Sequence, residues 1–420
     1  MKILMINHFP LAGSGSGTYT RNLAVHLHQL GHEVCIVLPE NTDDYSEVEG
    51  IRLHPVFFST EKTEIVPGKD YSGRSMAEAL PFNFPCFTSH PRSITNFADL
   101  NEDELDLYIK AFKAAIDDEI ESWKPDIIHG QHVWILPSLA IRKDIPLVLT
   151  AHGTDLMGYD KWPHLREYAE KAMEACFAVI SISKDNCVLL EERFPYQKKK
   201  IVMMRNGYDP NIFYPENMTR KEILDMYDID PKEYEGKKIV SFAGKLANFK
   251  GVDILLRAAK LYEDKEPDSL TLIVGDGDER DKLHALAKEL DLKKVVFLGN
   301  VSQTQLRHLY NIADVNLVPS RREPFGLVAI EAMACGTPVI ASNQGGLPDF
   351  VNDSVGGLVT PEDPEDLANK IIEVLRKTDE IDNEKWRKEI ASYARNHYAQ
   401  DKIIEELDEL YKKAIDSKKE

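Results

Sequence analysis

Residues 315–341 read VNLVPSRREPFGLVAIEAMACGTPVIA. The short apolar run Val315–Pro319 is typical of a buried strand, and Pro338–Ala341 is typical of another. Gly326–Ala334, between them, has the pattern of a helix. A strand, a crossover helix and a second strand form a parallel pair. This stretch therefore predicts an α/β fold with a parallel sheet.

The same alternation extends over the second half of the chain. Further strands are expected at Lys238–Ala243, Leu270–Val274 and Val295–Leu298, and helices at Val252–Leu261, Glu279–Leu290, Thr304–Ile312 and Pro364–Leu375. In the first half we expect six strands and two long helices: Lys2–Asn7, Glu33–Leu38, Asp126–His129, Pro146–Thr150, Cys176–Ile182 and Lys200–Met204, with helices Thr18–Leu30 and Glu102–Trp123. Two doubly wound units follow from this order of elements.

The turn cluster Asn206–Pro210 and the polar stretch up to Gly236 mark the expected hinge between the units. We expect domains at 1–205 and 206–390, with the charged helical residues 391–420 packing back on the first domain. Open α/β sheets bind ligands at the carboxyl ends of their strands, so the two units should face a shared central cleft.

Residues 56–101 interrupt the alternation and are rich in Pro, Phe, Ser and Thr. Such a long insertion could be functional, or it could be an ordinary packed surface loop. Its phenylalanines could form an apolar patch for a lipid, or they could simply pack: Phe57, Phe58, Phe82, Phe84 and Phe87.

The composition excludes several classes of protein. The 420 residues are 43% hydrophobic and 29% charged, which are globular values that exclude disorder. The net charge of −19 makes nucleic acid an improbable partner and disfavours broad docking on an anionic membrane, although a local patch could still touch one. Five cysteines without C-x-x-C spacing, no signal peptide and no membrane-length apolar run predict a cytoplasmic protein.

The start of the helix after Val315–Pro319 is a candidate anion site. Backbone N–H groups of Phe325, Gly326 and Leu327 should point out of this helix start. Glu323 and Glu331 flank it, but a spacing of eight residues separates them by roughly 10 Å, too far for an acid–base pair. They could accept hydrogen bonds from ribose and sugar hydroxyls, or they could be surface or helix-capping residues.

Two further loops follow strands of the second unit. Lys245 and Lys250 lie in the loop Gly244–Gly251, where their charges could offset a diphosphate or could be simply solvated. Gly275, in the Gly-Asp-Gly turn after the next strand, would let a ligand approach the backbone, although a lone pattern of this kind is more typical of a plain turn.

In the first unit, the loop Gly13–Thr18 has the glycines of a ligand-binding turn but not the spacing of a dinucleotide fingerprint. His152 ends a predicted strand and could hydrogen-bond a sugar hydroxyl or a leaving oxygen, or it could be an ordinary core or loop histidine with satisfied hydrogen bonds. His129 and His132 lie nearby in sequence, but their spacing does not match a known metal motif, so no metal site is expected.

Together these motifs resemble the retaining glycosyltransferases of family 4, which have the GT-B fold of two Rossmann-like domains. The resemblance covers almost all of the second unit and is looser in the first. It rests on Glu323–Glu331 and its flanks, Gly244–Gly251, Val274–Gly277, Gly345–Asp349, Asn206–Asp209, His152–Asp155 and the glycine-rich loop.

The resemblance implies a division of labour, with acceptor binding in the first domain and donor binding in the second. Lys245 and Lys250 would bind the donor diphosphate. Glu331 would hold the ribose hydroxyls. Glu323, with the backbone of residues 325–327, would hold the transferred sugar.

The remaining assignments come from the same resemblance. Gly275 would lie against the donor, and Val301 would meet the base through its backbone. His152 would contact the sugar from the opposite domain, and the loop around Gly17 would close over the diphosphate. Lys245 departs from the arginine that is usual in the family, which replaces a bidentate fork by a point charge.

The implied reaction moves a sugar from a nucleotide diphosphate sugar, such as UDP-glucose or UDP-GlcNAc, to an acceptor hydroxyl with retained configuration. The acceptor would be a small molecule or a glycan, which could be linked to a lipid. His152, Glu323 and Lys250 would act in a front-face mechanism without cofactor or metal, since no acidic D-x-D loop stands out. A GT-B sugar-nucleotide epimerase and a non-catalytic nucleotide-sugar-binding regulator are the alternatives.

Overall fold

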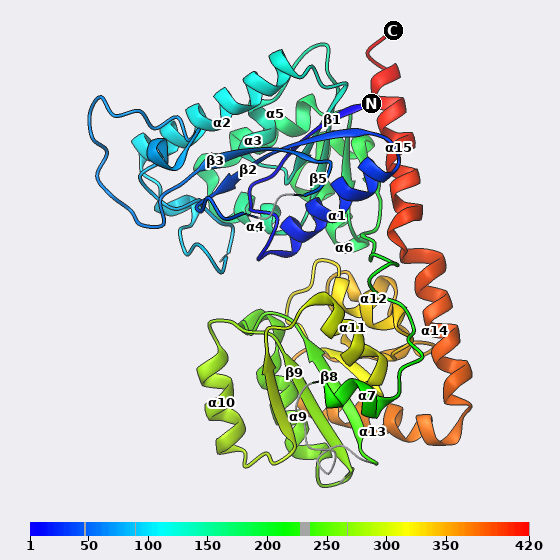
Figure 1. Ribbon diagram of the computed structural model, residues 1–420. Helices are drawn as coiled ribbons and strands as arrows, with labels where there is room; N and C mark the ends of the chain where they lie inside the picture. Colours follow the sequence, from blue (N-terminus) through cyan, green and yellow to red (C-terminus); the bar gives the residue numbers. More distant parts are fainter. Residues whose placement is uncertain (46–47, 89, 227–235, 267, 420) are drawn as a thin grey trace. The chain divides into compact units, whose positions relative to one another are not determined.

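A computed structural model describes residues 1–419 apart from 46–47, 89, 227–235 and 267. The chain divides into two compact units (Figure 1). The first comprises Met1–Arg205 and Ile404–Glu420, and the second comprises Asn206–Ile403. Part of the predicted hinge, residues 227–235, lies outside the described residues.

The first unit is built on a parallel sheet of seven strands in the order β3-β2-β1-β4-β5-β6-β7. The strands are β1 Lys2–Ile6, β2 Glu33–Glu40, β3 Arg52–Phe57, β4 Ile127–Gln131, β5 Leu147–Ala151, β6 Ala178–Ser181 and β7 Ile201–Met203. The helices are α1 Gly15–Gln29, α2 Glu102–Ser122, α3 Ile135–Leu139, α4 Thr154–Lys161, α5 Arg166–Ala175 and α6 Lys184–Arg193. Strand order reverses between β1 and β4, which is the usual ligand position in such sheets.

The sequence predicted six strands here and missed β3. This strand contains Pro55 and is only partly buried, so it lacks the continuous apolar run of the others. It lies at the edge of the sheet, where a proline removes no ladder hydrogen bond.

The insertion that follows β3 is packed into the first unit. Phe58, Phe82, Phe84 and Phe87 belong to the unit's hydrophobic core, and Phe57 is also buried. The phenylalanines therefore stabilise the fold and form no exposed apolar patch.

The second unit has a parallel sheet of six strands in the order β10-β9-β8-β11-β12-β13. Its strands are β8 Lys238–Ala243, β9 Ser269–Val274, β10 Val295–Gly299, β11 Val315–Val318, β12 Val339–Ser342 and β13 Gly356–Val359. Its helices are α7 Arg220–Asp225, α9 Val252–Tyr262, α10 Arg280–Glu289, α11 Gln303–Ile312, α12 Leu327–Ala334, α13 Pro364–Glu380 and α14 Asn383–Tyr398. The predicted α/β class of two doubly wound units is confirmed, although β13 was missed because its two leading glycines have low strand propensity.

The chain returns to the first unit at Ile404, within α15 Gln400–Asp416. The sequence placed this return at residue 391. Residues 391–403 belong to the second unit instead. Helix α14 packs on α12, and the backbone of Tyr208 forms hydrogen bonds with the residues before and after Ala399. The Tyr208 N–H donates to the Tyr398 carbonyl, and the Gln400 N–H donates to the Tyr208 carbonyl, both at 3.0 Å.

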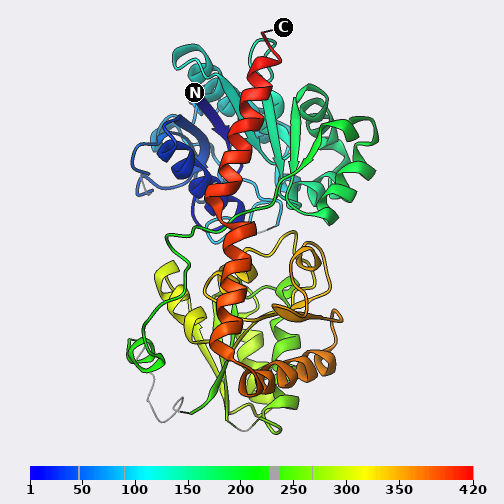
Figure 2. The ribbon, with the colours of Figure 1, turned by 90° about the vertical axis from the view of Figure 1, so that its right-hand side faces the viewer.

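The last part of α15 packs against the first unit (Figure 2). Leu407 and Tyr411 are buried there. The Tyr411 hydroxyl lies 2.5 Å from Nδ1 of His129 in β4, and Asp408 pairs with His32 at 3.1 Å. These contacts tie the end of the chain to the first sheet.

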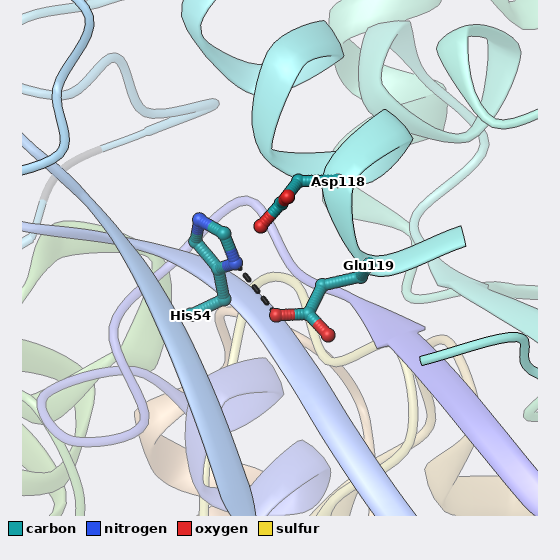
Figure 3. A group of neighbouring side chains, drawn as sticks. All are labelled: His54, Asp118 and Glu119. Carbon is teal, nitrogen blue, oxygen red and sulfur yellow. Dashed lines mark hydrogen bonds and ion pairs between the residues drawn. The ribbon is translucent and has the colours of Figure 1, made fainter. Parts of the chain in front are cut away.

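An ion cluster joins α2 to β3 in the same unit (Figure 3). Glu119 accepts a hydrogen bond from Nδ1 of His54 at 2.7 Å and from the Arg52 guanidinium at 3.0 Å, and Asp118 lies beside them. Carboxylate and imidazole atoms of this group lie within 4.8 Å of one another, a spacing that a metal ion could use. Arg52 already supplies the positive charge that balances the buried Glu119, so we interpret the cluster as structural.

Replacing Glu119 by Gln should destabilise the protein by about 2 kcal/mol at pH 7, because a buried hydrogen-bonded charge is lost. Burial alone would raise the pKa of Glu119, but the hydrogen bonds from His54 and Arg52 outweigh it and lower the pKa below 4.5. The contribution is therefore present above about pH 4.5 and is lost as the pH falls through the lowered value.

Urea unfolding of the wild type and of Glu119→Gln at several pH values measures this difference. The exposed Glu121→Gln serves as the control. An equal loss of stability at pH 3 and pH 7 would contradict the ionic origin.

Candidate active site

Lys250 and Glu323 form an ion pair at the carboxyl edge of the second sheet. Lys250 lies in the turn after β8, and Glu323 lies in the loop between β11 and α12. Because β8 and β11 are neighbouring parallel strands, both loops leave the same edge, at the point where the strand order reverses. The Lys250 Nζ lies 2.6 Å from Glu323 Oε2, and the side chains are only 19% and 9% exposed.

Two neighbours hold this pair in place. The Ser320 hydroxyl donates to Glu323 Oε2 at 3.2 Å. Arg321 forms two hydrogen bonds of 2.8 Å with the Asp253 carboxylate and donates to the Asn248 carbonyl at 2.7 Å. Its guanidinium thereby joins the lysine loop to the glutamate loop.

No sequence pattern points to Arg321 or Asp253. They lie 68 positions apart, and only the fold brings them together. The bidentate pair raises the pKa of Arg321 and lowers that of Asp253, whose own burial acts in the opposite direction. Both groups therefore stay charged at neutral pH.

The start of α12 presents backbone N–H groups that have no acceptor within the described residues. Gly326 precedes the helix with φ of 109°, a left-handed conformation that favours glycine, and a Cβ there would lie 2.6 Å from Leu347. Within the described chain, the backbone N–H groups of Phe325, Gly326 and Leu327 donate to no protein acceptor. The Phe325 ring is buried against Phe350, with ring centroids 5.4 Å apart. The predicted helix N-terminus with free donors is therefore present.

Glu331 lies one turn further along α12 and is partly buried beside Tyr310 and Cys335. Burial raises the pKa of its carboxyl group to about 7. No hydrogen bond or ion pair links its side chain to another residue in the described ranges. Both carboxylate oxygens are available to hydroxyl donors.

The other predicted donor residues lie on the same strand edge but not in the Lys250 cluster. Lys245 pairs with Asp278 in the loop after β9, with 3.4 Å between Nζ and Oδ1. Gly275 opens that loop, and its N–H donates to the Gly299 carbonyl at 2.8 Å. Val301 follows β10 and is partly exposed. The roles assigned to these residues from the sequence stay predictions.

In the first unit, His152 directly follows β5 and is 8% exposed. Its Nε2 lies 2.9 Å from Oε1 of Gln131, the last residue of β4. The rings of His132 and Tyr19 lie 4.7 and 5.2 Å from its own. Burial lowers the pKa of His152 to about 3, so the imidazole is neutral at physiological pH.

The predicted loop around Gly17 is instead the first turn of α1. The Ser14 hydroxyl caps this helix and accepts a hydrogen bond from the Gly17 N–H at 3.0 Å, so the helix begins three residues earlier than Thr18. A Cβ at Gly17 would lie 2.1 Å from the Pro10 carbonyl. Glycine is needed at position 17 for this close approach. Because the Gly17 N–H already donates to Ser14, it is not free to bind a ligand.

Among the described residues, no helix is both long enough and apolar enough to cross a bilayer. All five cysteines are free thiols.

Each of the two doubly wound units has a cluster of polar side chains at the carboxyl edge of its sheet, where open α/β sheets bind their ligands. Residues 227–397 match the family model of the glycosyl transferases group 1, and residues 90–212 match that of glycosyltransferase family 4. The chain is 31% identical to a D-inositol 3-phosphate glycosyltransferase of Corynebacterium aurimucosum over 89% of its length and 88% of that protein. The chain belongs to the family 4-type glycosyltransferases of the GT-B fold.

Solved structures agree with this fold. Sucrose-phosphate synthase from Thermosynechococcus elongatus superposes with a TM-score of 0.73 at 24% identity, covering 99% of this chain and all of that one. The complex of Anabaena HepE with UDP-glucose gives a TM-score of 0.72 at 19% identity, covering 98% of this chain and all of that one. At these identities the likeness concerns the fold.

The raised pKa of Glu331 predicts a pH-dependent stability. An acid whose pKa is about 7 when folded and 4.5 when unfolded stabilises the fold below pH 4.5, and this contribution is lost as the pH rises through 7. Glu331→Gln should therefore unfold at a higher temperature than the wild type at pH 8, with the difference disappearing near pH 4.

Thermal unfolding followed by circular dichroism at four or five pH values measures this trend. Glu289→Gln on the exposed face of α10 should show no such trend. If the difference in unfolding temperature between Glu331→Gln and the wild type did not change with pH, the Glu331 carboxyl group would not have a raised pKa.

Proposed function

We propose that this enzyme transfers a sugar from a UDP-sugar, such as UDP-glucose or UDP-GlcNAc, to an acceptor hydroxyl with retention of configuration. The observation that carries the proposal is the Lys250–Glu323 pair beside the free N–H groups at the start of α12. A cation and a helix N-terminus at the switch point of a Rossmann-like sheet suit a diphosphate. The uridine base is favoured by the fold relative HepE, whose structure contains UDP-glucose.

In the proposed complex, the second unit binds the donor and the first binds the acceptor. Lys250 and the N–H groups of residues 325–327 hold the diphosphate, and Lys245 approaches it from the neighbouring loop. Donor binding gives Lys250 a phosphate partner and frees Glu323 to accept hydrogen bonds from the sugar hydroxyls. The ligand-free ion pair keeps both groups charged and in place until then.

The remaining donor contacts follow the chemistry of each side chain. Glu331 accepts hydrogen bonds from the ribose hydroxyls, for which its unpaired carboxylate is suited. Gly275 and Val301 lie at the ends of β9 and β10 and contact the nucleoside through their backbone. Gly17 contributes by letting the first turn of α1 lie close to the Pro10 carbonyl in the loop after β1, not by closing over the donor.

The proposed chemistry takes place on one face of the sugar. The bond from the anomeric carbon to the diphosphate oxygen breaks while the acceptor oxygen attacks on the same side. The acceptor proton passes to the departing diphosphate. Lys250 and the helix N–H groups stabilise the negative charge that develops there, which is the largest contribution we assign to the protein. His152 is neutral at pH 7 and therefore acts by hydrogen bonding to the sugar, not as an acid.

The acceptor we propose is a small polar molecule or glycan with free hydroxyl groups. Relatives named as D-inositol 3-phosphate glycosyltransferases favour a polyol over a lipid-linked acceptor. Reduced cysteines favour a reaction in the cytoplasm, and we propose that it needs no metal ion.

A donor and acceptor screen tests the function. The purified full-length chain is incubated with UDP-, GDP- and ADP-sugars, with and without polyol and glycan acceptors, and free nucleotide is measured with and without EDTA. We expect UDP release that depends on the acceptor and persists with EDTA, and a product with the donor's anomeric configuration. Conversion of the donor into an epimer without an acceptor and without net nucleotide release would favour the epimerase, and tight donor binding without turnover would favour the regulator.

Lys250→Ala should lower kcat/KM for the best donor by roughly 10³-fold, because the departing diphosphate loses a charged partner. Steady-state kinetics at saturating acceptor measures the change. Lys260→Ala, which removes an exposed lysine of α9, is the matched control and should stay near the wild-type rate. Near-normal kcat/KM in Lys250→Ala would refute the proposed role of the ion pair.

A further inference from the structure

Gln131 and His152 meet because their strands are neighbours in the first sheet. Gln131 ends β4, His152 follows β5, and Gln131 pairs with Thr150 in the register of the two parallel strands. The side chains therefore leave the same edge of the sheet side by side. Gln131 is fully buried, and the contact between its Oε1 and Nε2 of His152 is 2.9 Å long.

This contact determines which nitrogen of His152 carries the proton. The structure places the Gln131 carboxamide oxygen against Nε2 of His152, and a carboxamide oxygen can only accept a hydrogen bond, so in this amide orientation Nε2 is the protonated nitrogen. Because the ring is neutral, Nδ1 then has a lone pair. Within the described ranges, no protein donor engages Nδ1.

Hydrogen bonds from two histidine rings hold the backbone of Gln131 in place. Its backbone carbonyl accepts hydrogen bonds from Nδ1 of His132 at 2.7 Å and from Nδ1 of His8 at 3.2 Å. The Leu136 N–H donates to Nε2 of His8 at 3.3 Å, so both nitrogens of that ring are satisfied in the neutral form. His132 adopts φ of 83°, a strained conformation for a residue other than glycine.

The groups that face His152 carry no charge at pH 7. They are Tyr19 of α1, His129 of β4 and His132 after it. Burial raises the pKa of Tyr19 and lowers those of the two histidines. Hydrogen bonding, and not a neighbouring charge, therefore determines which nitrogen of the His152 ring carries the proton.

We propose that Gln131 is a positioning residue that holds His152 in the Nε2-protonated form, so that Nδ1 accepts a hydrogen bond from a hydroxyl of the bound sugar. The identity of that hydroxyl group rests on the proposed function, whereas the protonation state does not. Gln131 acts through His152 and needs no contact with substrate.

Two variants separate this role from a structural one. Gln131→Met has a similar length and removes the acceptor oxygen. Gln131→Glu keeps an acceptor oxygen, so it preserves the protonated Nε2, and its charge raises the pKa of His152. The matched control is Asn186→Leu, since Asn186 is also a buried amide that accepts one side-chain hydrogen bond, from Ser181 at 3.0 Å, and has an unpartnered NH₂.

The experiment records ¹⁵N NMR signals of histidine-labelled protein, with His152 identified by the signals lost in His152→Asn. We expect a protonated Nε2 and a bare Nδ1 for His152 in the wild type, in Asn186→Leu and in Gln131→Glu at high pH. Gln131→Met should give a mixture of the two neutral forms and a kcat about 10-fold lower, with KM little changed. Gln131→Glu should lose activity as the pH falls through the raised pKa of His152, while the wild type stays flat.

Two results would overturn the proposal: a wild-type His152 protonated at Nδ1, or wild-type His152 signals in Gln131→Met. The NMR measurement needs no turnover. If the chain transferred no sugar at all, the proposed function would fail while the protonation state of His152 could still be decided.

Discussion

Parallel strand pairing is the constraint on which both candidate sites depend. In a parallel sheet every strand ends at the same edge, so residues far apart in sequence meet wherever two neighbouring strands stop. Lys250 and Glu323 are 73 positions apart and form a 2.6 Å ion pair because β8 and β11 are adjacent. Gln131 and His152 meet by the same rule at the ends of β4 and β5. The crossover helices matter for function mainly because they impose this order.

The ion pair also explains how a charged site can persist in a folded protein without its ligand. Each of these two poorly exposed charges would be costly alone, but their mutual attraction offsets part of the desolvation penalty. Ser320 adds a further hydrogen bond to the carboxylate. Arg321 and Asp253 then fix the loops that carry the pair. A ligand that offers a phosphate to the lysine and hydroxyls to the glutamate replaces each partner with an equivalent one. Under the proposed function, donor binding thus exchanges contacts without exposing an unpaired charge.

The sequence predicts those parts of this molecule that depend on local pattern. Continuous apolar runs such as Val315–Pro319 identify buried strands, and the two α/β units follow from their alternation with helices. Strand β3 was missed because Pro55 and partial exposure hide it, and β13 was missed because it begins with two glycines. The helix start at Ser14 was missed because Gly15 and Gly17 suggest a loop, while the capping hydroxyl outweighs their low helix propensity.

The candidate sites divide in the same way. Glu323, Lys250 and His152 could be singled out because each follows a predicted strand, and strand ends are where ligands bind. Their partners could not, since Arg321–Asp253 and Gln131–His152 are pairs that only tertiary structure creates. The protonation state of each group also cannot be predicted from the sequence. Glu331 and His152 have shifted pKa values because of burial, which depends on neighbours such as Tyr310 and His132.

The two units use opposite kinds of chemistry at their strand edges. The second unit presents Lys250, Glu323 and Lys245, all charged, beside a helix N-terminus. The first presents His152, His132 and Gln131, all neutral, among aromatic rings. A diphosphate needs fixed positive charges and N–H dipoles, whereas a sugar hydroxyl can be bound by a carboxylate or by an oriented neutral acceptor. Under the proposed function, the charged second sheet binds the diphosphate and, through Glu323, hydroxyls of the sugar, while the neutral first sheet adds an acceptor for a further sugar hydroxyl without attracting the phosphate.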